Sequence, residues 1–432
     1  MIDTIFALSS GSPPAGIAVI RISGPDALIV HRAFTAGRAT DLAARHARLV
    51  SLRHPASADI LDRCVAIYFP GPGSATGEDI VEWHVHGGRA VVQAVLRALE
   101  QHGVARPAQA GEFTRRAFEN GRIDLNEAEG LADLLSAETE TQRKAALRMA
   151  EGHFSRRIEG WRVRILFLAA MVEAQLDFSD EDDVPAEGQS HDLKVEIVSL
   201  RRELEHELER PSAERLRDGI AVIIAGPPNA GKSTLLNALA GRDAAIVSDI
   251  AGTTRDRIEV PVAMNGIAFL LTDTAGLRDE TEDAIEAVGI ERSRQALEAA
   301  DIILWLGDPA GKPRADAIAI GARCDAADFQ TSDDYDLLLS VKLGTGLDTL
   351  TDLLCERAAS ILPVEGEYVL HQRQRSALAE LVDCLDIAQD NSDWLIVAEE
   401  LRRSRNIIDR LTGKAGVEDM LDGLFGRFCI GK

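Results

Sequence analysis

The amino-acid sequence predicts a multidomain α/β plus α protein, in which an α/β domain is inserted between two halves of a helical domain. Strand and helix signals alternate over residues 214–370, as they do in βαβ domains. Helical periodicity fills residues 119–213 and resumes over residues 371–432. Residues 1–118 mix short strand-like runs with turn clusters, which predicts a separate N-terminal α+β domain. A chain of 432 residues is long enough for two or three such cores.

The N-terminal region contains several short strand signals. Strands are predicted over Gly16–Ile22, Cys64–Phe69 and Asp79–Val85, with a Pro-Gly turn over residues 70–73. A helix is predicted from Val91 to Gln101, because Gly103 ends the apolar pattern.

The helical region carries one clear apolar face. Its members recur at steps of three and four residues: Leu193, Ile197, Leu200, Leu204 and Leu208. Pro211 ends this helix. The stretch is short for a coiled coil, so packing within a bundle is the preferred interpretation.

Composition favours a cytoplasmic protein. Apolar residues make up 46% of the chain, but no apolar run approaches the roughly eighteen residues that a membrane span needs. The N-terminus lacks the pattern of a secretory signal, and none of the five cysteines forms a CxxC pair. The net charge of −23 disfavours broad, non-specific nucleic-acid binding.

A phosphate-binding loop is the most specific motif. The apolar strand Ile220–Ala225 leads into Gly226-Pro227-Pro228-Asn229-Ala230-Gly231-Lys232-Ser233, and a helix is expected to follow from about Thr234. This is GxxxxGKS between a strand and a helix, the context that the motif requires. Lys232 is expected to contact the β- and γ-phosphates, and the Ser233 hydroxyl to ligate Mg²⁺.

Two later motifs resemble the switch elements of a GTPase. Thr253 and Thr254 lie where a threonine hydroxyl can reach Mg²⁺ when the γ-phosphate is present. The run Asp273-Thr274-Ala275-Gly276 follows a predicted strand over Ala268–Thr272, and it favours a GTPase over a generic ATPase. Asp273 is expected to reach Mg²⁺ through water, and the Gly276 N–H to sense the γ-phosphate.

The motif that reads the base departs from the usual Asn-Lys-x-Asp. The corresponding residues are Ala322-Arg323-Cys324-Asp325, so the Asn is missing while Asp325 can still accept hydrogen bonds from guanine. Ser340 and Lys342 resemble the loop that closes over the base. GTP is therefore expected over ATP, by a reduced margin.

The residue that orients the attacking water is not identified by the motifs alone. Many switch GTPases carry Gln after the DTAG-type motif, whereas this chain has Leu277, which cannot hydrogen-bond. Carboxylates in Asp279–Glu291 could replace it, among them Glu286 and Glu291.

Motifs outside the nucleotide region extend the resemblance to the whole chain, which is similar to the MnmE (TrmE) family of tRNA-modifying GTPases. The most specific is the ending Cys429-Ile430-Gly431-Lys432. The others are Arg21-Ile22-Ser23-Gly24, Thr76-Gly77-Glu78-Asp79, His86-Gly87-Gly88 and Gly111–Phe118. The family architecture is an N-terminal folate-binding and dimerising domain and a discontinuous helical domain that carries an inserted P-loop GTPase domain.

The resemblance implies a homodimer that acts with a flavoprotein, MnmG (GidA), in a heterotetramer. Together such proteins add an aminomethyl or carboxymethylaminomethyl group at C5 of the wobble uridine (position 34) of tRNA. The one-carbon unit comes from a tetrahydrofolate derivative (5-formyl- or 5,10-methylene-tetrahydrofolate), and FAD on the partner handles the redox step. GTP hydrolysis drives the opening and closing of paired GTPase domains.

The resemblance also assigns residues. Asn229, Thr253 and the carbonyls around Ser248 and Ile250 match a K⁺ site, and Glu286 matches the water-orienting glutamate. Arg21, Glu78 and Lys432 match folate contacts, as does Arg122 where Lys is expected. Cys429 has an expected role in the tRNA chemistry. The nucleotide contacts expected from all these motifs are Asn229, Ala230, Gly231, Lys232, Ser233, Thr234, Ser248, Thr253, Thr254, Asp273, Thr274, Ala275, Gly276, Asp325, Ser340 and Lys342.

Two alternative functions also explain parts of the sequence. A ribosome-assembly GTPase explains residues 214–370 equally well, but not the N-terminal motifs or the Cys-x-Gly-Lys ending. A folate-dependent aminomethyl transferase with an accessory GTPase would bind the same folate. A wobble-uridine assay with the flavoprotein partner separates this second alternative from the main hypothesis.

Overall fold

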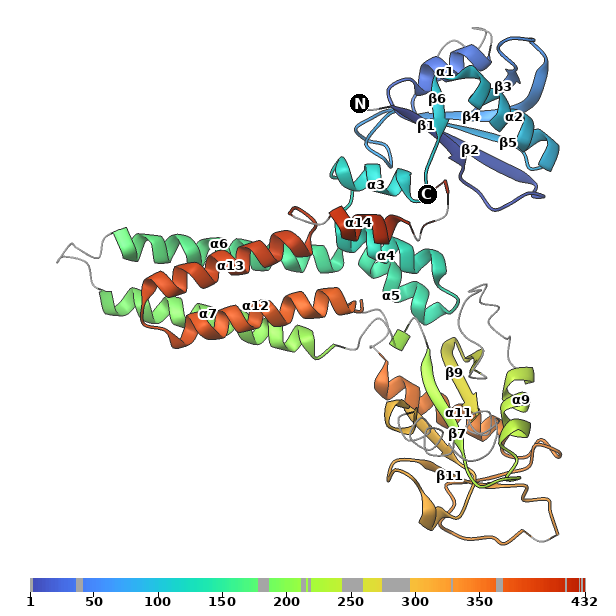
Figure 1. Cartoon of the computed structure of the whole chain (residues 1–432), viewed down its shortest axis with the longest axis vertical. Helices are drawn as coiled ribbons and strands as arrows, with labels where there is room; N and C mark the ends of the chain where they lie inside the picture. The colour runs from blue at the N-terminus through green and yellow to red at the C-terminus, as the bar shows by residue number, and fades with distance from the viewer. Residues whose placement is uncertain are drawn as a thin grey trace, which may run out of the picture. The chain divides into compact units, whose positions relative to one another are not determined.

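The computed structural model describes residues 3–35, 42–177, 186–210, 215–216, 219–242, 259–273, 296–327, 329–362, 368–415, 418–426, 428 and 430–431. For residues 186–191, 242 and 418–420 it describes the backbone alone. The chain divides into two compact units, Met1–Ala132 with Ile408–Lys432 (unit 1) and Asp133–Ile407 (unit 2) (Figure 1). None of the described helices is both long enough and apolar enough to cross a membrane.

Unit 1 is built on a six-stranded sheet of order β3-β4-β5-β2-β1-β6. All neighbouring strands are antiparallel except β1 and β6, which are parallel. The strands are β1 (Thr4–Leu8), β2 (Ile17–Ser23), β3 (Arg48–Arg53), β4 (Ile60–Phe69), β5 (Ile80–His86) and β6 (Ala105–Pro107). The predicted strands and the helix before Gly103 are confirmed, with ends that differ by a few residues.

Two helices cover one face of this sheet, α1 (Ala27–Phe34) and α2 (Arg89–His102). Their apolar side chains share a core with alternate residues of β2, such as Ile20 and Ile22. Because side chains alternate across a strand, Arg21 and Ser23 point to the opposite face. On that face, Phe113 of helix α3 (Glu112–Glu119) packs with Ile5 and Ala7 of β1. The predicted α+β fold is confirmed.

The C-terminal segment completes unit 1. Helix α14 (Glu418–Phe425) contributes Leu421 and Phe425 to a small core with Leu125 and Ala128 of α4 (Leu125–Ser136). The two elements are far apart in sequence, so unit 1 depends on both ends of the described chain.

The helices of unit 2 form a discontinuous bundle. They are α5 (Glu140–Ala150), α6 (His153–Asp177) and α7 (Ala186–Leu208) before the α/β domain, with α12 (Gln372–Asp390) and α13 (Trp394–Leu411) after it. The predicted apolar face of α7 is buried at Leu193, Ile197, Leu200 and Leu204. Helix α7 packs against both α6 and α12, so bundle packing is confirmed.

The inserted domain has a six-stranded sheet of order β12-β11-β10-β7-β9-β8, parallel apart from the β8–β9 hairpin. Its strands are β7 (Ile220–Ala225), β8 (Glu259–Met264), β9 (Ile267–Asp273), β10 (Ile302–Trp305), β11 (Ile318–Ala322) and β12 (Leu337–Leu339), and its described helices include α9 (Lys232–Arg242) and α11 (Leu347–Ile361). The predicted insertion is therefore observed. The boundaries at 118/119, 213/214 and 370/371 remain predictions.

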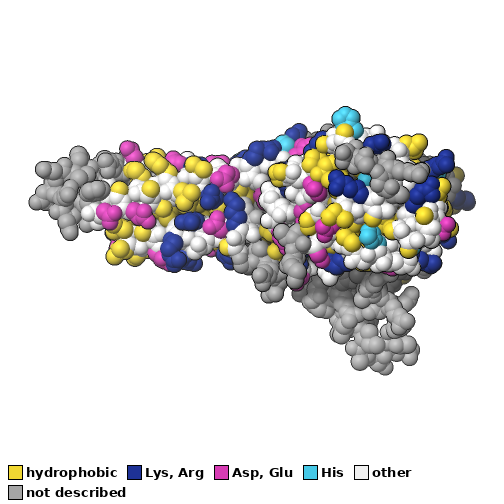
Figure 2. All heavy atoms as spheres, turned by 90° about the horizontal axis from the view of Figure 1, so that it is seen from above, with side chains coloured by type: hydrophobic (Ala, Val, Ile, Leu, Met, Phe, Trp, Pro, Cys, Tyr) yellow, Lys and Arg dark blue, Asp and Glu magenta, His cyan; other side chains and the backbone are white. Residues whose placement is uncertain are grey.

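The surface in Figure 2 carries acidic, basic and apolar side chains interspersed. Although the chain has a net charge of −23, the acidic side chains on the face shown there do not form one continuous patch.

Candidate functional site

The phosphate loop connects the end of β7 to the start of α9, as predicted. The backbone reverses through left-handed conformations at Asn229 (φ 60°) and Gly231 (φ 98°). Gly226 lets the loop pack closely against the Leu306 backbone, because a Cβ at this position would lie 3.0 Å from the Leu306 carbonyl oxygen. The N-terminus of α9 follows directly, so backbone N–H groups and the helix dipole favour an anion here.

Lys232 folds back across this loop. Its side chain is largely buried, and its ammonium Nζ donates hydrogen bonds to the carbonyls of Gly226 (3.1 Å) and Pro227 (3.0 Å). The charge is therefore held within the loop where phosphate oxygens are expected.

Two predicted magnesium residues are in contact. The Ser233 hydroxyl donates a hydrogen bond to Asp273 Oδ2 at 2.5 Å. Asp273 ends β9, which pairs in parallel with β7 so that Asp273 lies opposite Ile224. A hydroxyl and a carboxylate are the oxygen donors that Mg²⁺ prefers beside phosphates and water, so these residues fit the ion.

The base-reading segment shares a cleft of about 380 Å³ with the phosphate loop. Ala230, Gly231 and Thr234 line one end, while Ala322, Arg323, Asp325 and Lys342 line the other. Asp325 Oδ1 accepts a hydrogen bond from Ser340 Oγ at 2.7 Å. That hydrogen bond, with nearby Lys342 and Arg323, lowers the pKa of Asp325 below its ordinary value. An ionised acceptor is thus ready for a base that offers N–H donors.

The other predicted residues of this site lie outside the described residues. They are Ser248, Ile250, Thr253, Thr254, Thr274, Ala275, Gly276 and Glu286. The K⁺ cage and the water-orienting glutamate therefore remain predictions.

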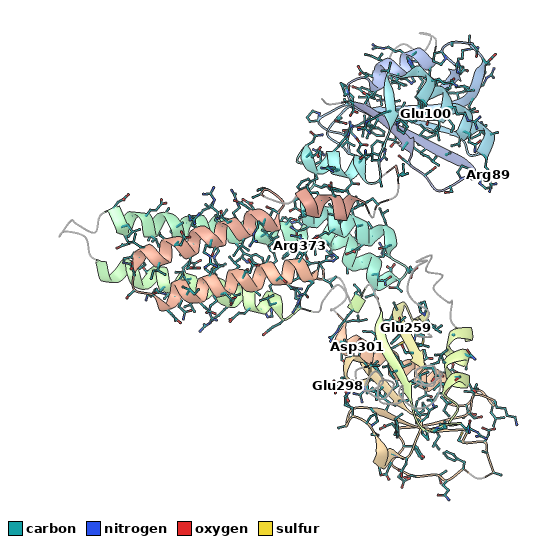
Figure 3. The ribbon with its side chains drawn as sticks, viewed as in Figure 1. Arg89, Glu100, Glu259, Glu298, Asp301 and Arg373 are labelled. Carbon is teal, nitrogen blue, oxygen red and sulfur yellow. The ribbon has the colours of Figure 1, made fainter. Side chains whose placement is uncertain are left out.

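A second cleft in the same domain lies at the opposite strand ends, beside the starts of β10 and β11. Arg215, Arg314 and Arg357 line it together with Glu298, Asp301 and Asp316, and Figure 3 shows Glu298 and Asp301 close together. Arg215 pairs with Asp301 at 3.3 Å and Arg314 with Asp316 at 2.6 Å. These groups neutralise one another, and we assign this cleft no ligand.

In unit 1, Arg21 and Glu78 lie around the face of β2 that α3 covers. The Arg21 guanidinium pairs with Glu82 at 2.8 Å and lies 5.6 Å from the centre of the Phe113 ring. Two residues along the same face, the Ser23 hydroxyl donates to Glu78 Oε2 at 2.8 Å.

Arg122 adjoins the turn that carries Glu78. Gly77 has φ 81°, and a Cβ added there would lie 3.3 Å from Arg122 Cγ and 2.8 Å from Asn120 Cβ. Asn120 also donates to the Thr76 carbonyl at 2.7 Å. The structure therefore places Arg122 beside Gly77, the residue before Glu78, near the C-terminal end of α3. Lys432 lies outside the described residues.

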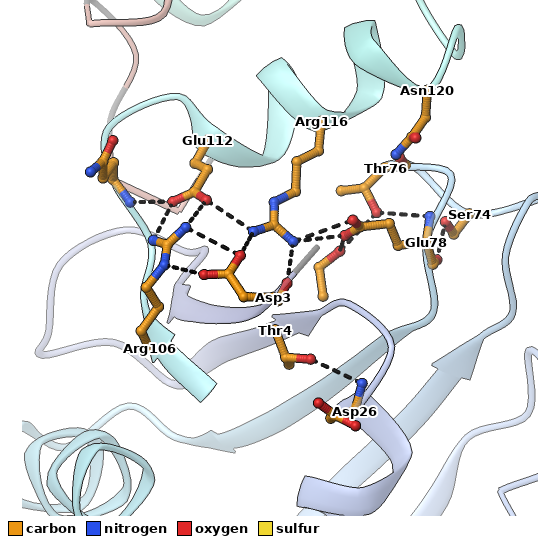
Figure 4. A network of polar contacts seen from close by, with 12 residues as sticks. Asp3, Thr4, Asp26, Ser74, Thr76, Glu78, Arg106, Glu112, Arg116 and Asn120 are labelled. Atoms are coloured by element: carbon orange, nitrogen blue, oxygen red, sulfur yellow. Dashed lines mark hydrogen bonds and ion pairs between the residues drawn. The ribbon is translucent and has the colours of Figure 1, made fainter. Parts of the chain in front are cut away.

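Arg116 is a residue of this region to which sequence reasoning gave no role, although it lies within the Gly111–Phe118 motif. It is nearly buried and contacts Asp3, Glu78 and Glu112 (Figure 4). Burial opposes its charge, but the hydrogen bonds and ion pairs with Glu78 and Glu112 outweigh that effect and raise the pKa of Arg116. Only the fold could reveal this role, because Asp3 and Glu78 are distant in sequence.

The chain next to Cys429 is docked on unit 1. Ile430 forms an antiparallel bridge with Ala110. Gly431 has φ 102°, and a Cβ there would overlap the Leu8 carbonyl oxygen. Phe428 is buried with Phe425. Cys429 itself lies outside the described residues.

Comparisons with known proteins agree with this architecture. Residues 4–122 match the family described as GTP-binding protein TrmE N-terminus, and residues 125–429 match the MnmE helical domain. Similar proteins named tRNA modification GTPase MnmE include one from Rhizorhabdus wittichii, 59% identical over all of this chain and 97% of its own length. Others are from Sphingopyxis alaskensis (52% identical, 96% of this chain, 100% of that protein) and Zymomonas mobilis (49% identical, 99% of this chain, 100% of that protein).

Proposed function

Because the chain belongs to the MnmE family of tRNA modification GTPases, we propose that it hydrolyses Mg²⁺·GTP in the cleft described above and couples hydrolysis to tRNA modification. The observation that carries this proposal is the cleft itself. It is lined at one end by the phosphate loop and at the other by Asp325, while Ser233 and Asp273 meet beside the loop. Lys232 supplies a cation for the phosphates, and the ionised Asp325 supplies an acceptor for guanine.

Hydrolysis is proposed to depend on K⁺, with Asn229 as a ligand. Asn229 is exposed in the phosphate loop, and its carboxamide oxygen is a suitable ligand atom for an alkali cation. When bound there, K⁺ would neutralise the charge that develops between the β- and γ-phosphates. Glu286 is proposed to orient water, because Leu277 cannot.

The tRNA chemistry is proposed to use a reduced folate bound to unit 1. Glu78 offers an acceptor for pterin N–H groups, and Arg21 and Arg122 offer cations for the anionic glutamyl part. Within a homodimer, and with the FAD of the partner MnmG, the one-carbon unit would reach C5 of the wobble uridine. Cys429, beside the docked Ile430, is proposed to take part in this step.

The decisive experiment incubates the full chain with MnmG, GTP, a methylene-tetrahydrofolate donor and an unmodified tRNA. Nucleosides are then analysed by mass spectrometry. Aminomethyl- or carboxymethylaminomethyl-uridine at position 34 is expected, and Lys232→Ala should abolish it. GTP turnover without any change in the uridine would instead favour a ribosome-assembly GTPase.

A further inference from the structure

We propose that Arg116 is a positioning residue of the folate site, which holds the Glu78 carboxylate in the orientation that binds the reduced folate. This inference rests on the proposed function of unit 1, since it takes Glu78 as a folate contact. It adds a residue that the family motifs leave without a role.

The Glu78 carboxylate is fixed from two sides. Its Oε2 atom accepts from Ser23 Oγ at 2.8 Å and from Arg116 Nη1 at 3.1 Å, and its Oε1 atom lies 3.3 Å from the same Nη1. The Glu78 side chain keeps an exposed fraction of 14%. A carboxylate can accept about four hydrogen bonds, so these contacts leave acceptor capacity for a ligand.

Arg116 is itself held by groups that do not belong to the folate site. Nη1 also donates to the Asp3 carbonyl at 2.7 Å, while Nη2 donates to Asp3 Oδ1 at 2.7 Å and Glu112 Oε1 at 3.0 Å. The guanidinium is thus held between Asp3, which precedes β1, its own helix and the turn that carries Glu78. A planar fork can satisfy these directions together, whereas a Lys ammonium is a point charge and cannot.

Arg106 provides a matched comparison within the same network (Figure 4). It pairs with the same two acids, Asp3 and Glu112, through contacts that do not include Glu78. If the network has only a structural role, replacing either arginine should change folate binding only by destabilising unit 1. If Arg116 positions Glu78, replacing Arg116 should weaken folate binding directly, whereas replacing Arg106 should not.

The test measures the Kd of 5-formyltetrahydrofolate for the full chain by calorimetry. The chains compared are the wild type, Arg116→Lys, Glu78→Gln, the double variant and Arg106→Lys. Arg116→Lys is expected to weaken binding about tenfold, the effect of one lost charged hydrogen bond. The double variant should bind no more weakly than Glu78→Gln alone, because Arg116 acts through Glu78. Arg106→Lys should stay within about twofold of the wild type.

Thermal unfolding and GTP turnover report whether each variant is folded. If Arg116→Lys does not fold, Arg116→Gln replaces it in the same cycle, because Gln removes both the charge and the planar fork that hold Glu78. Unchanged folate affinity in the folded Arg116 variant, or additive losses in the double variant, would overturn the inference and leave the folate proposal standing. A wild-type chain that binds no reduced folate would overturn both.

Discussion

The Ser340 hydroxyl donates a hydrogen bond to the Asp325 carboxylate over 2.7 Å, and it also accepts one from the Leu343 N–H at 3.2 Å. Ser340 is buried. Its two hydrogen bonds link the loop after β12 to the base-reading acid after β11. Two segments of the base site are thereby fixed to each other.

Ser340→Ala should weaken GTP binding several-fold, since Asp325 loses the hydrogen bond that orients it. The pKa of Asp325 is lowered in the native chain, so its ionised form persists at neutral pH and is lost as the pH falls through that pKa. Removing Ser340 should raise this pKa, and the two affinities should diverge further as the pH approaches about 4. Fluorescent GTP titrations at several pH values measure this, and parallel curves would contradict it.

Ala322→Asn should widen the preference for GTP over ATP. Ala322 lines the base end of the cleft, where its methyl group offers no hydrogen bond. A carboxamide there restores the missing partner for guanine, which is worth roughly two- to tenfold. Competition titrations with both nucleotides measure the ratio, and Ala322→Ser is the control for size. Equal displacement of GTP by ATP in the unaltered chain would refute guanine preference itself.

GTP turnover should be faster in K⁺ than in Na⁺, and Asn229→Ala should remove most of that difference. The reason is the proposed cation beside the phosphates, which neutralises charge in the transition state. Phosphate release is measured at matched ionic strength. The same turnover in both salts would rule out the cation site. An Asn229→Ala chain that still hydrolyses GTP faster in K⁺ than in Na⁺ would show that Asn229 is not a ligand of the cation.

The stability of unit 1 should fall as the pH drops from about 6.5 to about 4. Burial, together with nearby Arg32 and Arg48, lowers the pKa of His31 to about 4, and its Nδ1 accepts a hydrogen bond from the Trp83 indole at 3.1 Å. Between those pH values the unfolded chain binds a proton that the native chain does not, so stability present above about pH 6.5 is lost. The full loss is about 3 kcal/mol.

His31→Gln should flatten this pH dependence, because Gln does not titrate. Urea unfolding at two pH values measures it, with Trp161, Trp305 and Trp394 replaced by Phe so that fluorescence reports Trp83. If the free energy of unfolding of His31→Gln fell with pH as steeply as that of the wild type, groups other than His31 would be responsible for the acid sensitivity.

Gly431→Ala should reduce wobble-uridine modification strongly and leave GTP turnover unchanged. The added Cβ would overlap the Leu8 carbonyl, and φ 102° is strained for Ala. We therefore expect the C-terminal segment that carries Cys429 to detach from β1. Cys429→Ser should have the same effect on modification without releasing the tail. Limited proteolysis distinguishes the two variants. Normal modification in both would remove the tail from the chemistry.

The sequence predicted those parts of the molecule that depend on local pattern. The strand Ile220–Ala225 was predicted with its observed ends, because an apolar run before a Gly-rich loop is unambiguous. The contacts around Arg116 could not be predicted, since they join residues 113 and 38 positions apart. Likewise, the docking of Gly431 on β1 depends on shape complementarity, which no local pattern encodes.

The closure of unit 1 by α14 also has a consequence for biosynthesis. Arg115 pairs with Asp422 across a sequence separation of 307 residues. Translation proceeds from the N-terminus, so the ribosome must complete all of unit 2 before this partner exists. Meanwhile the apolar side chains that later meet Leu421 and Phe425 remain uncovered on the nascent chain. Completion of unit 1 therefore waits until unit 2 has been synthesised, and it depends on the arrival of α14 rather than on formation of the sheet.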